Sequence, residues 1–402
     1  MKVLVVDKFP QPTLDNMKAQ GFEVLYNPEL KGPELVAEVK RSGAQTLVVR
    51  STKVTEEMVE GSGLRLVIRA GSGYDTIDVG ACSCRGIYVS NCPGKNATAV
   101  AELALGLLLA LDRRIPDNVA ELRQKKWNKK EYSKARGLYG RTLGVIGTGQ
   151  IGRLVIERAK AFGMPVVAWS RSLTPEKAAA LGVERKASPE EVAAAADVVT
   201  VHVAKTADTK GLCGEKFFAA MRPGAYFINT ARGEVVDEEA LRKAVREKGI
   251  RAGLDVFAKE PATATGAFEG DIVELPGVYG THHIGASTDQ AQDAIAEETL
   301  RVLQVYRDTG HVANVVNLCA HSPATHVLVV RHRDRVGVLA HVLNGLRGAG
   351  INVQEMENII FSGAEAAVAR IHIDRAPPDG TLSSIREGNA DIYELDLLSL
   401  SE

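Results

Sequence analysis

Three side chains in the second half of the chain have the types that reduction of a carbonyl group requires. Arg232 is permanently charged and carries a planar fork that can hold and polarise an α-keto carboxylate. His283 can give or take a proton near neutral pH, and Glu260 could hold its ring and raise its pKa. Each residue alone could equally be an ordinary surface or core residue. Because all three follow predicted strands, their joint placement favours a catalytic site.

The hydride donor of such a reaction is indicated by a glycine-rich turn. Gly147, Gly149 and Gly152 form the pattern G-x-G-x-x-G between a predicted strand at 143–146 and a helical pattern at 151–162. The first glycine permits a tight turn, the second lets the backbone approach a pyrophosphate, and the third allows close helix packing. The helix N-terminus then offers unpaired N–H groups to the phosphates. We therefore expect a bound dinucleotide, with a glycine-rich turn in an α/β core as the alternative.

One feature of the usual NAD fingerprint is missing. An acidic residue that accepts hydrogen bonds from the ribose hydroxyls is expected about 20 residues after the glycines, at the end of the second strand. This strand, at 165–169, is followed instead by Ser170 and Arg171. A hydroxyl and a guanidinium can bind the 2′-phosphate that a carboxylate would repel. NADP therefore stays open beside NAD, although Arg171 could equally point into water.

Two polar segments follow predicted strands in the first third of the chain. Arg50 and Ser51 come directly after a strand, where open α/β sheets bind ligands. Arg50 is therefore a candidate holder of an anion, or else a surface ion-pair partner. Gly71, Ser72 and Gly73 follow the next strand, and successive N–H groups around two glycines form a concavity that suits a carboxylate. A plain strand-to-helix turn is the alternative for this segment.

Short β-rich segments alternate with helical patterns over most of the chain, which predicts an α/β protein with parallel sheets. The strands are expected at 3–6, 23–26, 46–49, 66–69, 86–89, 143–146, 165–169, 197–203, 225–229, 251–257 and 277–279. From Asn96 a long apolar helix runs to Arg114 and links two such layers. Its apolar stretch at 99–111 is too short to cross a bilayer.

The composition limits the possible partners. The 402 residues carry a formal net charge of −1, which gives no general attraction to nucleic acid or to an anionic membrane, and no nucleic-acid motif is present. The basic run at 113–136 indicates a solvated helix face, with a rim that attracts an anionic ligand as the alternative. The five cysteines lack paired C-x-x-C spacing, so neither a metal site nor a disulfide framework is expected. No apolar leader precedes the first strand, and we expect a cytoplasmic protein.

The character of the chain changes after Pro323. Strands are predicted at 326–331, 352–361, 366–373 and 391–397, with an amphipathic helix at 337–348 and a short helix before the last strand. The order βαββαβ indicates a separate small domain with a ferredoxin-like arrangement.

Four segments, GTGQIG, NTARGEVVDEEAL, GLDVFAKEPA and HHIGAST, occur in an order and spacing that resemble the signatures of the D-isomer-specific 2-hydroxyacid dehydrogenase family. The resemblance covers residues 3–317 and implies an oxidoreductase that uses a nicotinamide dinucleotide. By this resemblance Arg232, Glu260 and His283 take the substrate-orienting, histidine-assisting and acid/base positions. His282 stands where the family usually has Pro, but the following Ile-Gly-Ala-Ser-Thr sets the register on His283.

The resemblance also implies the binding residues. The backbone at 71–73 would hold the substrate carboxylate, and Arg50, Ser51, Asn96 and Lys129 would contact its phosphate and polar groups. Asp255 would lie near the nicotinamide carboxamide. The full set of expected cofactor residues is Gly147, Gly149, Gln150, Ile151, Gly152, Ser170, Arg171, Thr230 and Asp255.

The implied fold is discontinuous. A flavodoxin-like α/β substrate-binding domain would comprise residues 1–97 and 287–317. A Rossmann-type, doubly wound dinucleotide-binding domain at 98–286 would be inserted in it. Closure between the two would exclude water from the path of the hydride.

The tail at 326–402 resembles an ACT regulatory domain through the segment VLVVRHRDRVGVLAHVLNGLRGAGINVQEM, although Val336 stands where that family has Pro. ACT domains generally pair side by side and bind amino acids at the interface. The resemblance therefore implies a homodimer or homotetramer and L-serine as an effector, held by His332, Asp334 and Asn352. A purely structural dimerisation module is the alternative.

The two resemblances together are typical of family members that oxidise 3-phosphoglycerate to 3-phosphohydroxypyruvate in serine synthesis. A hydride would pass between C2 of the substrate and the nicotinamide, with NAD ahead of NADP, and His283 would take the hydroxyl proton. One alternative is a glyoxylate or hydroxypyruvate reductase, which Ser170 and Arg171 suggest. Another is a non-enzymatic dinucleotide-sensing protein, since corepressors share this fold.

Overall fold

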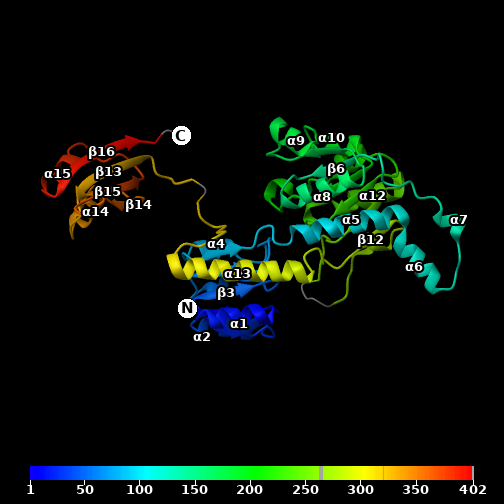
Figure 1. The fold of residues 1–402 in the computed structure, drawn as a ribbon, viewed down its shortest axis with the longest axis horizontal. Coiled ribbons are helices and arrows are strands. Elements are labelled where there is room, and N and C mark those ends of the chain that lie inside the picture. The colour runs from blue at the N-terminus through cyan, green and yellow to red at the C-terminus, as the bar shows by residue number, and fades with distance from the viewer. Residues whose placement is uncertain (262–265, 320, 401–402) are drawn as a thin grey trace. The chain divides into compact units, whose positions relative to one another are not determined.

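The computed structural model describes residues 1–261, 266–319 and 321–400. It contains two compact units, Met1–Asn317 and Leu318–Glu402 (Figure 1). The last residue of the segment GLDVFAKEPA, at 262, and the end of the predicted C-terminal domain, at 401–402, lie outside the described residues.

The first unit begins with a parallel sheet of five strands in the order β2-β1-β3-β4-β5. This is the strand order of flavodoxin-like sheets, and it confirms the fold expected for this part of the chain. The strands are β1 (Lys2–Val5), β2 (Glu23–Tyr26), β3 (Thr46–Val49), β4 (Leu66–Arg69) and β5 (Tyr88–Asn91). The helices between them are α1 (Gln11–Ala19), α2 (Gly32–Arg41), α3 (Glu56–Val59) and α4 (Val79–Ser83).

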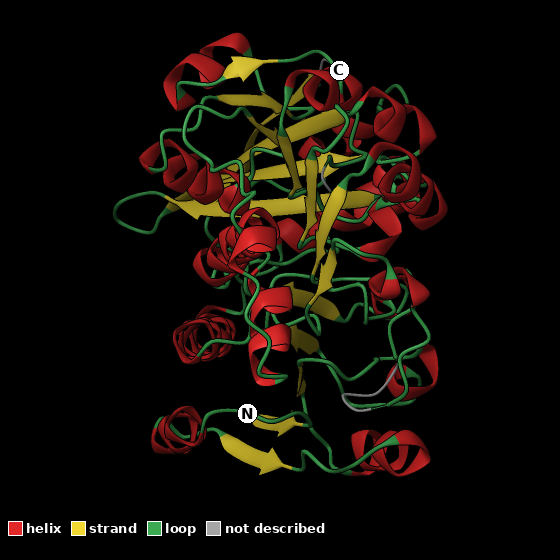
Figure 2. Ribbon diagram, turned by 90° about the vertical axis from the view of Figure 1, so that its right-hand side faces the viewer, coloured by secondary structure: helices red, strands yellow, loops and turns green. Residues whose placement is uncertain are grey.

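The helix α13 (Asp289–Thr309) lies against this sheet although it comes from the far end of the unit, as its yellow colour beside the blue strands shows (Figure 1). Its Ile295 and Leu303 belong to the same buried cluster as Val5 of β1. Helices therefore stand on both sides of the strands near the N-terminus (Figure 2). The sheet buries two apolar faces, as a parallel sheet requires.

Seven parallel strands form the second sheet, in the order β12-β11-β10-β9-β6-β7-β8. From β6 the chain adds β7 and β8 on one side, and then returns to add β9 to β12 on the other side, so the strand order reverses between β6 and β9. This order confirms the predicted Rossmann-type doubly wound sheet. The strands are β6 (Leu143–Ile146), β7 (Val166–Trp169), β8 (Glu184–Arg185), β9 (Val198–Val201), β10 (Tyr226–Asn229), β11 (Arg251–Leu254) and β12 (Val278–Gly280). The helices are α5 (Ala97–Arg113), α6 (Ile115–Arg123), α7 (Lys129–Tyr132), α8 (Gln150–Ala161), α9 (Pro175–Leu181), α10 (Pro189–Ala195), α11 (Glu215–Ala220) and α12 (Glu238–Lys248), with the 3-10 turns η1 (Ala207–Thr209), η2 (Gly233–Val235) and η3 (Asp271–Glu274).

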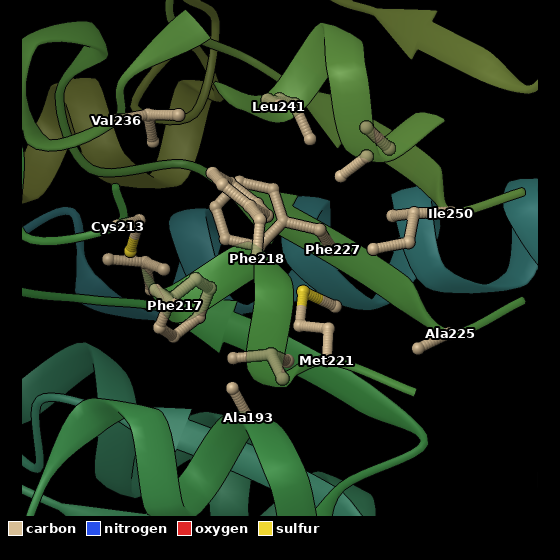
Figure 3. Packing of buried hydrophobic residues seen from close by; sticks show 14 of the residues in the cluster. Ala193, Cys213, Phe217, Phe218, Met221, Ala225, Phe227, Val236, Leu241 and Ile250 are labelled. Atoms are coloured by element: carbon tan, nitrogen blue, oxygen red, sulfur yellow. The ribbon is translucent and has the colours of Figure 1, made fainter. Parts of the chain in front are cut away.

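Apolar side chains cover both faces of the second sheet. On one face Phe217, Phe218 and Phe227 pack edge to face, with ring centroids 5.1, 5.2 and 6.0 Å apart (Figure 3). On the other face α5 packs with α8 over the strands, and Leu107 shares a buried cluster with Ile228. Burial of each such side chain contributes roughly 1.5–3 kcal/mol to the stability of the fold. In the described part of the chain no helix, α5 included, is long and apolar enough to cross a membrane.

The second unit contains an antiparallel sheet of four strands in the order β14-β15-β13-β16. Its elements follow the predicted order βαββαβ, which confirms the ferredoxin-like arrangement. Leu328, Val342 and Ile371 are among the fully buried side chains between sheet and helices. The elements are β13 (His326–Arg333), α14 (Val338–Gly348), β14 (Val353–Ile360), β15 (Ala366–Ile373), α15 (Thr381–Glu387) and β16 (Ile392–Ser399).

Candidate active site

His283 and Glu260 contact each other beyond the carboxyl ends of β12 and β11. Nδ1 of His283 is 2.7 Å from Oε2 of Glu260, and the imidazole is 46% exposed. The N–H of Phe257 donates to the other carboxylate oxygen at 3.0 Å. Burial acts to raise the pKa of Glu260, but the hydrogen bonds from His283 and Phe257 and the nearby positive charges outweigh it, so the pKa is lowered. Glu260 is therefore an anion that orients the ring, and Nε2 is the nitrogen left for a substrate proton.

The buried carboxylate of Asp255 holds the backbone that carries His283. Its oxygens accept hydrogen bonds from the Thr281 hydroxyl at 2.6 Å and from the N–H groups of Ile284 and Gly285 at 2.8 and 2.9 Å. The Asp255 carbonyl accepts from the N–H of His283 at 2.8 Å. His283 has a φ of 52°, in the left-handed region that costs an L-residue roughly 1–2 kcal/mol. These four hydrogen bonds stabilise the left-handed conformation of His283. The expected contact of Asp255 with the nicotinamide carboxamide stays a prediction.

Arg232 extends from the end of β10 toward the first sheet. Its Nε and Nη2 each lie 3.3 Å from a carboxylate oxygen of Asp75, which follows β4. The guanidinium also lies over Gly73, where a Cβ would collide with Nη2. Any residue other than glycine at 73 would therefore displace Arg232. The two-pronged contact with Asp75 is the kind that a substrate carboxylate would also make.

The guanidinium of Arg69 lies close to those of Arg232 and Arg50. Arg69 ends β4 and folds back over Gly71, where a Cβ would collide with it. Its buried Nε has no hydrogen-bond partner among the described residues. Burial and the positive charges of Arg232 and Arg50 lower the pKa of Arg69 to about 10, although Asp75 opposes this. Arg69 thus lies between the charges of Arg232 and Arg50, with the carboxylate of Asp75 beside Arg232 and Arg69.

The turn that carries Arg50 is held by Asp7 at the end of β1. The Asp7 carboxylate accepts hydrogen bonds from the N–H groups of Arg50, Ser51 and Thr52 at 2.7, 3.1 and 3.1 Å. The hydroxyls of Ser51 and Thr52 donate to it at 3.0 Å. Burial lowers the pKa of Arg50, partly offset by the charge of Asp7. Ser51 therefore supports the turn, and its predicted contact with a substrate stays a prediction.

The remaining predicted substrate residues separate into two places. The Ser72 hydroxyl donates to Oδ1 of Asn96 at 2.7 Å, so the start of α5 joins the turn at 71–73. Lys129 instead lies on α7, beside Trp127 in a shallow cleft between α6 and α7. Within the described residues no hydrogen bond or ion pair connects Lys129 with the arginine cluster. Its predicted role stays a prediction.

The glycine-rich turn after β6 fits a pyrophosphate. At Gly147, which has a φ of 97°, a Cβ would collide with the carbonyl of His202, and at Gly152 it would collide with the carbonyl of Gly147. At Gly149, just before α8, a Cβ would meet nothing within 4 Å. Packing therefore requires the first and third glycines, whereas the second leaves the backbone open to an approaching phosphate.

Other predicted cofactor residues lie beside this turn. Gln150 and Ile151 begin α8, directly after Gly149. The N–H of Gly147 donates to the carbonyl of Trp169 at 2.8 Å, which places Ser170 next to the turn.

The segments after β10 and β7 complete the predicted cofactor set. Thr230, after β10, is 7% exposed, and its hydroxyl has no hydrogen-bond partner among the described residues, a state that a bound ligand would relieve. Arg171, after β7, is exposed and pairs with Asp208, with Nη1 and Oδ2 2.6 Å apart. His202, after β9, is neutral, because burial lowers its pKa to about 3.

The described residues hold no group of three or more His, Cys, Asp or Glu side chains that could bind a metal ion.

In the second unit, the predicted effector residues lie at the ends of β13 and before β14. His332 is 1% exposed, and its Nε2 is 3.2 Å from Oδ1 of Asn358 on β14. Asp334 is exposed, and its N–H donates to the carbonyl of Glu365 at 3.0 Å. The N–H of Asn352 donates to Asp374 at 3.0 Å.

Four residues of the site were not predicted from the sequence: Asp7, Arg69, Asp75 and Asp208. Arg69 carries a signal, since it ends a strand before a turn just as Arg50 follows one. The three acidic residues lie in turns outside any motif, and only their partners reveal them.

Known proteins are similar to this chain in sequence and in fold. Residues 105–285 match the model described as D-isomer specific 2-hydroxyacid dehydrogenase, NAD binding domain. Over 326 residues the chain is 40% identical to the D-3-phosphoglycerate dehydrogenase of Methanocaldococcus jannaschii, with 79% of this chain and 60% of that protein covered. Over 357 residues it is 37% identical to the D-3-phosphoglycerate dehydrogenase of Mycobacterium bovis, with 88% of this chain and 66% of that protein covered.

The chain thus spans less than two thirds of the length of these two relatives. Among solved structures, the NAD+-bound 3-phosphoglycerate dehydrogenase of Entamoeba histolytica has a TM-score of 0.66 and 27% identity, with 79% of this chain and 99% of that chain covered. The family expected from the four sequence motifs is confirmed. The chain belongs to the D-isomer-specific 2-hydroxyacid dehydrogenase family.

Proposed function

We propose that the protein is an NAD-dependent dehydrogenase that oxidises 3-phosphoglycerate at C2 to 3-phosphohydroxypyruvate. His283 is the acid/base, Glu260 orients it, and Arg232 holds the substrate carboxylate together with the backbone at 71–73. The relatives from Methanocaldococcus jannaschii and Mycobacterium bovis carry the name of this activity, which supports the choice of substrate. The NAD+-bound structure from Entamoeba histolytica supports the choice of cofactor.

The bound nicotinamide supplies the hydride acceptor. Because Nδ1 of His283 faces Glu260 at 2.7 Å, Nε2 accepts the proton of the C2 hydroxyl. The Glu260 anion then stabilises the imidazolium that forms. Arg232 exchanges the carboxylate of Asp75 for that of the substrate, and the two-pronged contact orients C2.

The observation that supports this substrate is the group of three guanidiniums in which Arg69 lies close to both Arg232 and Arg50. Guanidiniums keep their charge, so a half-buried group of them favours the binding of anions. Glyoxylate and hydroxypyruvate each carry one carboxylate. 3-Phosphoglycerate carries a carboxylate and a phosphate of about −1.5 to −2 charge, so it offers two anionic groups to the guanidiniums.

The test compares oxidation of 3-phosphoglycerate with that of D-glycerate, which lacks the phosphate. R69A and R50A are expected to lower kcat/KM for 3-phosphoglycerate by about 10- to 100-fold, the effect of losing a charge-assisted contact. With D-glycerate kcat/KM should change by less than about threefold. Equal losses on both substrates would contradict the phosphate contact.

The alternatives give different results in the same assay. A wild-type chain that reduces glyoxylate or hydroxypyruvate but does not oxidise 3-phosphoglycerate would contradict the proposed substrate. A chain that binds a dinucleotide but turns over none of these compounds would favour the sensing protein.

The C-terminal unit is, in the same proposal, an ACT domain that binds an amino acid such as L-serine at His332, Asp334 and Asn352. A homodimer or homotetramer follows, because β14 is an edge strand with an exposed apolar surface, and such edges tend to pair. Its exposed apolar residues, 39–53% exposed, are Met356, Ile359 and Ile360, followed by Phe361.

We further propose that residues 1–97 and 287–317 form the substrate-binding domain, 98–286 the dinucleotide-binding domain and 326–402 the regulatory domain. The packing of α13 onto the first sheet supports the discontinuous first domain. All five cysteines are free thiols, which supports a reducing compartment such as the cytoplasm.

A further inference from the structure

A carboxylate from another strand end pairs with the arginine that stands where the NAD fingerprint has an acidic residue. The strand β7 is followed by Ser170 and Arg171 instead of an acidic residue. Nη1 of Arg171 lies 2.6 Å from Oδ2 of Asp208, which is 37 positions further along the chain. Asp208 belongs to η1, the short turn after β9.

The Arg171–Asp208 pair joins the two strand ends that flank the glycine-rich turn. In the sheet, β6 lies between β7 and β9. The N–H of Gly147 donates to the last carbonyl of β7 at 2.8 Å, and the carbonyl of Ile146 accepts from the residue after β9 at 2.7 Å. In this fold the ribose of the adenosine half lies at the end of the second strand, which here is β7. The pair is therefore placed beside that ribose.

The backbone around Asp208 is anchored. The N–H of Thr206 donates to the Thr209 hydroxyl at 2.8 Å. That hydroxyl, on a residue only 7% exposed, donates in turn to the carbonyl of Ala204 at 2.6 Å. The hydrogen bonds thus hold the backbone of the turn, and the Asp208 side chain lies in solvent, where it contacts Arg171.

We propose that Asp208 takes the place of the missing acidic residue and that the Arg171–Asp208 pair makes the protein prefer NAD to NADP. This inference rests on the proposed function, whose cofactor it specifies. Arg171 alone would attract a 2′-phosphate, but Asp208 matches its charge and repels a second anion at the same place. The uncharged ribose hydroxyls of NAD can instead donate hydrogen bonds to a carboxylate.

The test measures the dissociation constants of NADH and NADPH by fluorescence titration of the full chain without substrate, so the readout does not depend on turnover. The wild type should bind NADPH at least about tenfold more weakly than NADH. In D208N, which removes a negative charge and keeps the size, the NADPH dissociation constant should fall by about tenfold and the NADH value should change by less than about threefold. The double variant R171A/D208N should lose this gain, because it lacks the guanidinium that binds the phosphate.

A matched control changes the same charge elsewhere. Glu215 on α11 is an exposed carboxylate paired with Lys243 at 3.2 Å, and E215Q should change neither dissociation constant. Equal affinity of the wild type for the two nucleotides, or an unchanged ratio in D208N, would overturn the inference and leave the dehydrogenase reaction untouched. The expected ratio without turnover of 3-phosphoglycerate would support the inference and contradict the proposed substrate. Binding of neither nucleotide would overturn both.

Discussion

The contact of 2.7 Å between Nδ1 of His283 and Oε2 of Glu260 gives the two ring nitrogens different tasks. In the proposed reaction, Nδ1 anchors the ring and Nε2 exchanges the substrate proton. Because the pKa of Glu260 is lower in the fold than in the unfolded chain, the contact stabilises the fold above the usual pKa of a carboxyl group. This contribution is lost as the pH falls through the lowered pKa. Near neutral pH, Glu260 is therefore ionised.

The variant E260Q keeps the shape of this residue and removes its charge. We expect kcat for 3-phosphoglycerate oxidation to fall by about 100-fold, because the imidazolium that forms during the reaction loses its counter-ion. The difference between the wild type and E260Q should shrink as the pH falls through the lowered pKa of Glu260, because the wild type then also loses this charge. Steady-state rates across the pH range measure both effects, and E274Q, on the exposed turn η3, serves as the control. A kcat that is unchanged in E260Q near neutral pH would contradict the electrostatic role of Glu260.

The sequence predicts the reacting residues better than the residues that hold them. Arg232, Glu260 and His283 lie in short motifs after strands, so their types and spacing are visible along the chain. Asp75 lies 157 positions from Arg232, and its contact arises only when turns from two sheets meet. No local periodicity links such turns, which is why the charge balance of the site could not be predicted.

At the scale of elements, strong periodicity gave the right type of element and left its ends uncertain. The unit β6–α8–β7 was predicted from its apolar strands and glycines, and its ends differ by only one residue from those expected. The strand β8, with two residues, and the helix α3, with four, are too short to show a period. The loop after β12 was predicted to carry His283, but the left-handed backbone at His283 was not predicted. That conformation depends on hydrogen bonds to Asp255, which lies at the end of another strand.

This loop gives a prediction for Asp255 and Thr281. T281V removes one of the four hydrogen bonds and should lower kcat by roughly 3- to 10-fold. D255N turns one carboxylate oxygen into an N–H donor that faces backbone N–H groups, and should lower kcat by about 100-fold or more. The NADH dissociation constant should stay within about threefold in T281V, and thermal melting checks that both variants fold. A large loss of NADH affinity in D255N with kcat unchanged would instead favour the predicted contact with the nicotinamide.

At the scale of the whole molecule, the chain packs as two separate units. In our proposal the first carries out the reaction and the second controls it. An effector on the second unit can change the rate only if it binds two states of the chain with different affinity. Coupling free energies of this kind are typically about 1–3 kcal/mol, which corresponds to about 5- to 150-fold in affinity. Inhibition by L-serine within that range would therefore need no contact between effector and substrate.

The effector residues give the matching prediction. Asp334 and Asn352 are exposed, so D334A and N352A should fold and keep the uninhibited kcat/KM. Each should raise the L-serine concentration for half-inhibition by about tenfold or more, because it removes hydrogen bonds to a charged ligand. D379A, at an exposed loop position of the same unit, should leave inhibition unchanged. Calorimetry adds a second readout, since linkage requires saturating substrate to weaken L-serine binding by the factor with which L-serine weakens substrate binding. If the full chain neither bound L-serine nor lost activity in its presence, the second unit would act in dimerisation alone.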